Sequence, residues 1–377
     1  MDVKPITSMA QVDAGTWNRL AGDGYPFLRH EFLLALEQSG CAAAETGWSP
    51  HHLLVLRNDM PRACMPLYLK THSRGEYVFD QQWAHAYQQC GLNYYPKWLT
   101  AIPFTPCQGP RMMVDESADA QEVTRLLVAF IKQLSEQNGI SSWHCLFPEP
   151  EQAQWLRDQG LSLRESVQFH WLNRGYRDFD DFLQTFSSSK RKMIKRERRR
   201  VCEQGIELRR LSGREVSPAQ WQAFFQFYTM TYLKNGMSPY LNLAFFEQLA
   251  ATMGEKLLLV LAVKDDQYVG AALSVIGADT LYGRYWGCYE EYNNLHFEAC
   301  YYQGLEYCIA HGLKRFDSGA QGEHKIARGF EPVTTCSAHW LKDAEFARAV
   351  EHFLHEERQA VALYKQDAAT YLPFKKD

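Results

Sequence analysis

Apolar positions along this chain recur with helical and strand periods and predict an α/β protein. Helical spacing is clearest over 120–137, where Asn138 and Gly139 provide a stop. Short apolar runs bounded by turn residues predict strands, as in 52–57. The same reasoning predicts further helices at 14–20, 30–38, 151–159, 178–186, 189–204, 219–233, 244–253 and 344–364, and further strands at 62–70, 140–147, 163–171, 206–209, 257–263, 268–276, 282–288 and 314–317.

An internal repeat predicts two copies of one α/β unit. The tetrapeptide Leu-Leu-Val-Leu at 53–56 recurs at 258–261, and each copy is followed by a polar turn and a second strand. A glycine followed ten residues later by His-Trp occurs at Gly160 and again at Gly329. Markers that keep the same order indicate a duplication more strongly than one shared tetrapeptide does.

The repeat predicts two tandem domains with mixed sheets, 1–175 and 176–377, the second including a basic helical insertion at 187–204. The extra stretch 73–108 is aromatic without a clear period, so we expect a long, partly ordered connection. In each copy a helix crosses over to a parallel strand, and ligands bind where such sheets open. The ends of strands 282–288 and 314–317 are therefore the expected active site.

Composition limits the class of protein. With 377 residues, 46% of them hydrophobic, the chain can bury the cores of two domains. Its net charge of -4 means that a polyanion must be bound by a local patch. The ten cysteines occur without a Cys-x-x-Cys pair, which predicts reduced thiols and no zinc site. We expect no bound metal and no bound cofactor. The N-terminus lacks a secretory signal and no apolar run reaches membrane-spanning length, so we expect a cytoplasmic protein without a transmembrane segment.

Three stretches carry a resemblance to a known family. They read SSSKRKMIKRERRR at 187–200, LHFEACYYQG at 295–304 and GAQGEHKIARGF at 319–330. The chain resembles tandem-GNAT N-acyltransferases similar to the Fem-type peptidoglycan aminoacyltransferases, and in particular a bacterial FemAB-like group linked by name to peptidoglycan biosynthesis or recognition. The resemblance implies two GNAT-like domains. It also implies transfer of an acyl or aminoacyl group from acyl-CoA or aminoacyl-tRNA to an amine acceptor, such as a peptidoglycan precursor.

One loop departs from the resemblance. Acetyl-CoA-dependent members bind pyrophosphate on the backbone amides of a basic, glycine-rich loop after the fourth strand. The corresponding stretch 288–294, Cys-Tyr-Glu-Glu-Tyr-Asn-Asn, has two glutamates and neither glycine nor arginine. The departure keeps open a non-catalytic protein that recognises a glycan or peptide. With weaker support, the basic run 190–200 keeps open a nucleic-acid-binding protein.

Acyl transfer to an amine requires a proton acceptor, and five side chains are candidates: His296, Glu298, Asp317, Glu323 and His324. We favour Glu323 or His324, which follow a glycine-punctuated loop beyond a strand end. His296 and Glu298 are two apart on a helix and point about 200° apart, so they cannot serve one atom jointly. Each candidate also has a structural alternative, since Glu298 can complement a helix dipole and Glu323 can cap a short helix.

Seven residues are predicted to contact substrate, on the central strand, at the next strand end and in the following loop: Arg284, Tyr285, Trp286, Asp317, Gln321, Lys325 and Arg328. On an alternating strand Tyr285 faces opposite to Arg284 and Trp286. An arginine there meets either a carboxylate, such as Asp317, or a ligand. Lys325 and Arg328 either hold an anionic part of the substrate or form a solvated face.

The run 190–200 has eight basic residues in eleven. As a helix it would turn Met193, Ile194 and Val201 inward and surround them with cations that repel one another. A solvated helix is the simpler interpretation. The repulsion favours an anionic partner, such as a phosphate of tRNA, of CoA or of a lipid pyrophosphate, and the predicted phosphate-binding residues are Lys190, Arg191 and Lys195.

Overall fold

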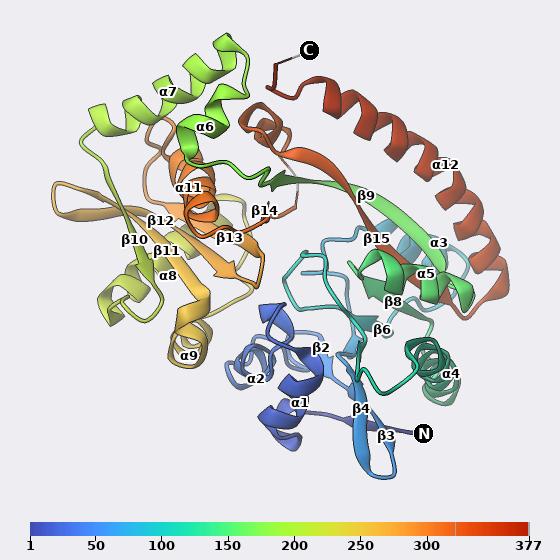
Figure 1. Cartoon of the computed structure of the whole chain (residues 1–377). Helices are drawn as coiled ribbons and strands as arrows, with labels where there is room; N and C mark the ends of the chain where they lie inside the picture. The colour runs from blue at the N-terminus through green and yellow to red at the C-terminus, as the bar shows by residue number, and fades with distance from the viewer. Residues whose placement is uncertain (321, 376–377) are drawn as a thin grey trace. The chain divides into compact units, whose positions relative to one another are not determined.

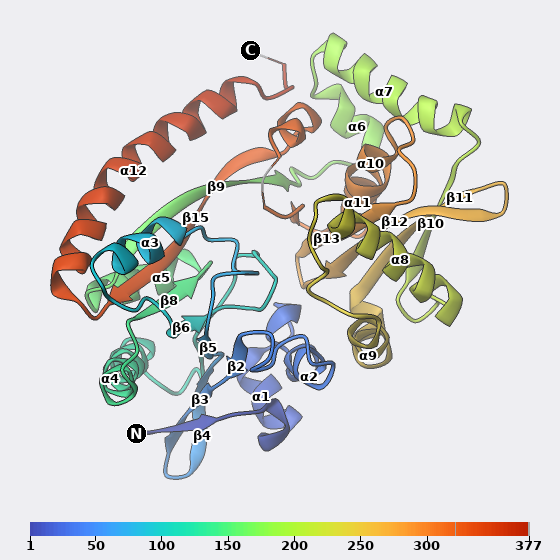
Figure 2. The same cartoon turned by 180° about the vertical axis from the view of Figure 1, so that it is seen from behind.

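The chain folds into two compact units (Figures 1 and 2). The computed structural model describes residues 1–320 and 322–375. Each unit combines two separate stretches of the chain: Met1–Ser166 with Thr334–Tyr364 in unit 1, and Val167–Val333 with Lys365–Asp377 in unit 2.

Unit 1 contains a sheet of order β1-β3-β4-β7 and strands in the order β15-β8-β6-β5-β2. Val123, Leu127 and Ile131, spaced by four residues on α4, pack with Val55 and Trp143 in one core. The elements are β1 (Asp2–Ile6), α1 (Ala14–Ala21), α2 (His30–Gln38), β2 (Trp48–Pro50), β3 (His52–Arg57), β4 (Met60–Met65), β5 (Tyr68–Lys70), α3 (Gln81–Gln89), β6 (Lys97–Thr100), β7 (Met113–Val114), α4 (Ala120–Asn138), β8 (Ser142–Leu146), α5 (Pro150–Asp158), and parts of β9 (Ser162–Leu172), β15 (Glu331–Leu341) and α12 (Ala344–Thr370).

Unit 2 is built on strands in the order β10-β11-β12-β13-β14-β9. The ring of Tyr285 packs against α8 and α9, whereas the ring of Trp286 lies near His296 of α10, so helices cover both faces. The elements are α6 (Phe179–Gln184), α7 (Ser188–Glu203), β10 (Glu207–Ser212), α8 (Pro218–Lys234), α9 (Leu243–Met253), β11 (Leu257–Lys264), β12 (Gln267–Ile276), β13 (Thr280–Cys288), α10 (Leu295–Phe297), the π-helix Glu298–Tyr302, α11 (Gln303–Ala310), β14 (Arg315–Asp317) and the 3₁₀ helix Glu323–Arg328.

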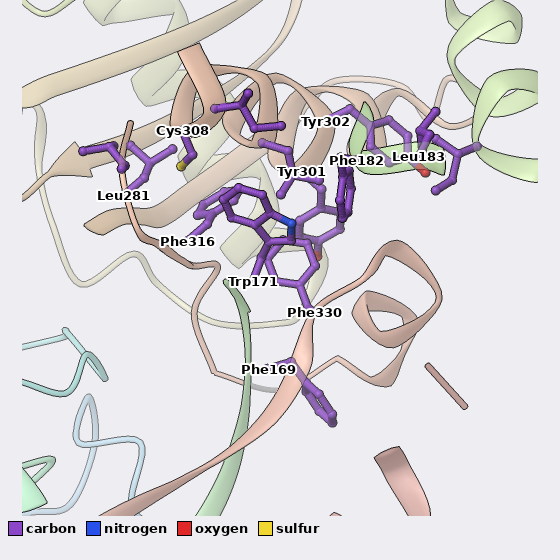
Figure 3. Close-up of a cluster of buried hydrophobic side chains, with 14 of the residues drawn as sticks. Phe169, Trp171, Phe182, Leu183, Leu281, Tyr301, Tyr302, Cys308, Phe316 and Phe330 are labelled. Carbon is purple, nitrogen blue, oxygen red and sulfur yellow. The ribbon is translucent and has the colours of Figure 1, made fainter. Parts of the chain in front are cut away.

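The core of unit 2 lies under the helix that contains the π-helical turn. Figure 3 shows Trp171, Phe316 and Phe330 converging beneath Tyr301 and Tyr302. The helix approaches the sheet closely, because a Cβ at Gly304 would lie 2.5 Å from the ring of Phe316. Burial of these aromatic rings fixes the helix above the sheet.

The units differ from the predicted continuous domains 1–175 and 176–377, because the unit boundaries fall inside β9 and β15. The end of β9 pairs antiparallel with β14 in unit 2. The later part of β15 pairs antiparallel with β8 in unit 1. Each repeat thus passes its last strand to the sheet of the other repeat, which a pattern read in chain order does not reveal.

Most predicted elements are present, and the main error lies in 73–108. That stretch contains α3 and β6, so the prediction of a long, partly ordered connection was wrong there. The predicted strand 62–70 is interrupted at Pro66 and forms β4 and β5. No described helix offers the apolar length that a bilayer crossing requires.

Two histidines form a buried pair in unit 1. His144 of β8 and His339 of β15 are directly opposite, and their Nδ1 atoms are 2.7 Å apart, so one ring donates to the other. Burial lowers the pKa of His144 to about 3 and lowers the pKa of His339 well below its usual value. The folded state therefore binds fewer protons than the unfolded state below pH 6.5, and stability decreases as the pH falls.

We expect His339→Asn to weaken this pH dependence. One such histidine makes the free energy of unfolding fall by about 1 kcal/mol between pH 6.5 and pH 5.5, and the variant lacks that contribution. Urea unfolding at the two pH values measures it, and His85→Asn, at an exposed histidine of α3, is the control. An unchanged pH dependence in His339→Asn would show that folding does not lower the pKa of His339.

Candidate active site

A cavity of about 170 Å³ opens in unit 2 where β13 and β14 stop pairing. The parallel pairing ends at Tyr282 and Asp317, and the residues that follow them in the chain, Gly283 of β13 and Ser318 after the end of β14, line the cavity. This is the position expected for the active site. The complete lining is Ala272, Leu273, Ser274, Gly283, Arg284, Tyr285, Trp286, His296, Cys300, Tyr301 and Ser318.

A β-bulge in β13 sets the direction of Arg284. Leu273 pairs with Tyr285 whereas Ser274 pairs with Gly283, so Arg284 is the extra residue. Bulges redirect a side chain next to functional sites. Arg284, Tyr285 and Trp286, all predicted to contact substrate, contribute to the lining, and Tyr285 packs on the opposite face from Trp286 as predicted.

The helix entry provides the second wall of the cavity. His296 lies in α10, and the π-helix that follows brings Cys300 and Tyr301 to the lining. A π-helical turn inside a helix is common at functional sites. The sequence interpretation did not single out Cys300 or Ser318, although Ser318 directly follows the predicted strand end.

Two histidines meet at Tyr301. The Tyr301 hydroxyl and His324 Nε2 are 2.8 Å apart, and the rings of His296 and His324 have centroids 5.8 Å apart. Burial, and then the positive charges of His324, Arg328 and Lys325, lower the pKa of His296 to about 4. Burial also raises the pKa of Tyr301. At neutral pH the cavity therefore contains a neutral imidazole and a protonated phenol.

Although His324 contacts two side chains of the described cavity lining, Tyr301 and His296, that lining includes neither of the two favoured catalytic residues, Glu323 and His324. Both residues are exposed on the 3₁₀ helix Glu323–Arg328. Burial, Lys325 and Arg328 lower the pKa of His324. Gln321, predicted to bind substrate, lies outside the described residues.

Glu298 is buried outside the described cavity lining and forms an ion pair with Arg198, which is half-buried. Arg198 of α7 donates from Nε and Nη2 to its two carboxylate oxygens, both at 3.0 Å. Gln303 donates to the same carboxylate at 2.7 Å. These contacts use the carboxylate to attach α7 to the π-helix, which favours a structural role for Glu298 instead of the predicted proton transfer.

Arg328 and Lys325 are also held by the protein. Arg328 donates to both carboxylate oxygens of Glu197 at 2.9 and 3.0 Å and to the Tyr302 hydroxyl at 3.1 Å. Lys325 Nζ donates to the carbonyl oxygens of Ser318 and Gly319 at 3.1 and 2.8 Å. Both side chains are buried, and neither belongs to the described lining of the cavity. They hold neighbouring residues in place, whereas the sequence predicted that they contact substrate.

Asp317 likewise supports the loop at the cavity. It is buried, accepts the Gly319 backbone N–H at 2.9 Å, and lies 3.6 Å from His170 Nε2. Its predicted role as a substrate contact is not supported by the lining, in which the neighbouring Ser318 takes part. Within the described residues no group of three or more metal-ligating side chains could hold a metal ion.

The basic run forms α7, with Ile194 and Val201 buried as predicted. A surface hollow of about 510 Å³ along α7 is lined by two of the three predicted phosphate-binding residues, Arg191 and Lys195. Lys195 also lies 2.9 Å from the exposed carboxylate of Asp180. Lys190, the third, is half-buried and absent from the described lining. The hollow is completed by Ser189, Lys192, Met193, Arg196 and Arg199.

A larger cavity of about 490 Å³ adjoins the first. Trp286 and His296 line both, so they form the wall between the two spaces. The larger one also takes in Glu291 and Asn294 of the loop that replaces the expected pyrophosphate loop. Its remaining lining is Thr231, Lys234, Asn235, Cys288, Tyr292, Leu295 and Phe297.

The sequence and fold are similar to known proteins. Residues 8–376 match the FemAB-like family, described as peptidoglycan biosynthesis/recognition. The structure of FemX is similar over 93% of this chain and 100% of FemX, with 12% identity and a TM-score of 0.54. L-PGS from Bacillus licheniformis is similar over 86% of this chain and 94% of that protein, with 10% identity and a TM-score of 0.51. No curated protein has a significantly similar sequence. The predicted class, α/β with two tandem GNAT-like domains, is confirmed.

Replacing Glu298 with Gln tests its structural role. In Glu298→Gln the buried side chain loses its charge-assisted hydrogen bonds from Arg198, which keeps its second partner Glu306, so we expect the free energy of unfolding to fall by about 1.5–3 kcal/mol. Urea unfolding measures this change. Glu207→Gln breaks an exposed pair with Arg209 and should leave stability nearly unchanged. Equal, small effects of the two substitutions would contradict the structural assignment.

Proposed function

Because the chain belongs to the FemAB-like family, described as peptidoglycan biosynthesis/recognition, we propose that it is an N-acyltransferase. It transfers an acyl or aminoacyl group from aminoacyl-tRNA or acyl-CoA to an amine, with a peptidoglycan precursor as the acceptor. The observation that carries the proposal is the cavity between the diverging β13 and β14, with a neutral histidine and a phenol in its wall.

Two side chains of the cavity lining carry out the two proton transfers that the reaction requires. The acceptor nitrogen attacks the carbonyl carbon, a C–N bond forms, and the ester or thioester bond breaks. The amine must lose a proton and the leaving oxygen or sulfur must gain one. His296 is neutral at pH 7 and accepts the amine proton. The Tyr301 hydroxyl, in contact with His324, donates to the leaving group.

The two adjoining cavities suit a donor with a large carrier. The reacting carbonyl lies at the wall of Trp286 and His296, with the carrier in the larger space. The loop at that space contains Glu290 and Glu291 where CoA-dependent relatives have a glycine-rich cradle. This composition favours aminoacyl-tRNA over acyl-CoA as the donor.

Turnover by purified protein tests the function. Charged tRNA or acyl-CoA is mixed with muropeptide amines, and mass spectrometry detects the acylated acceptor. We expect His296→Gln and Tyr301→Phe each to lower turnover by about a hundredfold or more, as for loss of a general acid or base. The control Tyr371→Phe makes the same chemical change at an exposed tyrosine and should retain activity.

The same assay separates the alternatives. Loss of turnover in Glu323→Gln, with His296→Gln active, would move the base to Glu323. Wild-type turnover in both His296→Gln and Tyr301→Phe would remove their roles. Binding of muropeptides without a product from any donor would indicate a recognition protein instead of an enzyme.

We also propose that the exposed face of α7 binds the phosphates of the donor. Lys192, Arg196 and Arg199 are exposed and line the hollow along the helix. Each phosphate contact releases counterions, so the affinity for tRNA depends on salt.

The triple variant Lys192→Gln/Arg196→Gln/Arg199→Gln should bind tRNA more weakly. We expect the slope of log K against log salt to become shallower by about 0.7 to 0.9 for each phosphate that the variant no longer neutralises. Fluorescence anisotropy between 50 and 200 mM salt measures it, with Arg209→Gln on β10 as the exposed control. Affinity that does not depend on salt would exclude this role for α7.

A further inference from the structure

The polar end of the small cavity is formed by Arg284 and Ser318. Both line the cavity, one from the bulge of β13 and the other just after β14. The guanidinium lies against Gly319, since a Cβ there would be 3.8 Å from Arg284 Nη1. The two strand ends lie close together, because a Cβ at Gly283 would be 3.5 Å from Ser318 Cα. A cation and a hydroxyl are thus brought to one end of an otherwise aromatic space.

The state of the Ser318 hydroxyl favours a bound ligand. Its Oγ is buried and has no hydrogen-bond partner among the described residues. A buried hydroxyl without a partner costs free energy, and most such groups in native proteins are satisfied. A ligand oxygen that accepts from this hydroxyl removes the cost. The backbone around it is already fixed, because Asp317 and Lys325 hold the neighbouring peptide groups.

The electrostatics of the cavity favour an anion. Among the described lining residues, Arg284 is the one with a permanent charge, and His296 is neutral at pH 7. Lys325 and Arg328 lie outside the described lining and also favour an anion, since both lower the pKa of His296 and of His324. A small negative group is attracted to a cation in such a low-dielectric space more strongly than in water.

Size limits the ligand. A protein cavity of about 150 Å³ holds one benzene molecule. The 170 Å³ here therefore suits a group of similar size, which is that of a single amino-acid residue. A phosphorylated sugar or a nucleotide is larger than this space.

We propose that this cavity binds the carboxylate of an amino acid or of a peptide terminus, with Arg284 and the Ser318 hydroxyl donating to its oxygens. The assignment rests on the proposed function in one respect, that the carboxylate belongs to the amine acceptor. The free α-amino group shares a carbon with the carboxylate in an amino acid and lies one residue away in a dipeptide, so an acceptor held in this way presents its nitrogen to the wall formed by His296 and Tyr301. The acceptor class is then an amino acid or short peptide with both groups free.

Isothermal titration calorimetry with the dipeptide Ala-Ala and its C-terminal amide tests the assignment. Hydrogen bonds to a charged group contribute about 1.5–3 kcal/mol, so we expect the wild-type protein to bind the acid about tenfold or more tightly than the amide. Arg284→Gln should remove this preference. Ser318→Ala, a small change that leaves the charge in place, should weaken binding of the acid about three- to tenfold. Arg214→Gln, at an exposed arginine of unit 2, is the matched control and should bind as the wild type does.

The outcomes decide the proposal without an acyl donor. Equal binding of acid and amide by the wild type, or no binding of either, overturns it. Wild-type affinity for the acid in both Arg284→Gln and Ser318→Ala overturns it as well, and if Arg284→Gln does not fold, the acid–amide comparison and Ser318→Ala decide. A protein that prefers the acid but forms no acylated product retains this binding site and loses the proposed transferase activity.

Discussion

The parallel pairing of β13 and β14, which stops at Tyr282 and Asp317, is the constraint on which the rest of unit 2 depends. Backbone groups beyond that point lose their partners in the sheet and need others. The Asp317 carboxylate accepts the Gly319 N–H, and the Lys325 ammonium takes the carbonyl oxygens of Ser318 and Gly319. Because the loop is fixed by these two side chains instead of a neighbouring strand, the space between the strands stays open as a cavity.

Helix α7 links this cavity to a charged surface through two faces of different chemistry. Its inner face places Glu197 against Arg328 and Tyr302, and Arg198 against Glu298 of the π-helix. Truncating one side of such a buried pair is costly, so the helix is firmly attached to the wall that contains Tyr301. Its outer cations are partly balanced, as by Asp180, which the sequence interpretation did not foresee. A phosphate bound outside would therefore be held at a fixed position relative to the cavity.

Sequence patterns predicted the helices and side-chain directions that depend on nearby residues. They missed the elements and roles that depend on partners far away in the chain. Helix α8 was predictable because Ser217 and Gln220 form a capping box at its start. Helix α3 was not, since the Asp80 side chain makes no cap bond and instead binds Lys97 and Tyr94. At the site, strand alternation indicated the faces of Tyr285 and Trp286 correctly. The role of Glu298 was not predictable, because its partner Arg198 is 100 residues away in the chain.

Unit 1 has a parallel strand pair that corresponds to β13 and β14. In unit 1, however, a loop of the chain fills the space beyond the end of that pairing. Strands β6 and β8 pair up to Thr100 and Cys145. Beyond them Arg111, which is fully buried, donates to the carbonyl oxygens of Leu146 and Cys107 at 2.8 and 2.7 Å. Its remaining nitrogen donates to the carbonyl groups of two further residues of the same loop, Gly109 and Pro110. Polar groups that the protein satisfies by itself leave nothing for a ligand to replace, whereas the Ser318 hydroxyl of unit 2 has no partner among the described residues. The two copies thus differ at this position, because the β6–β8 pairing ends at a loop held by Arg111 and the β13–β14 pairing ends at a cavity.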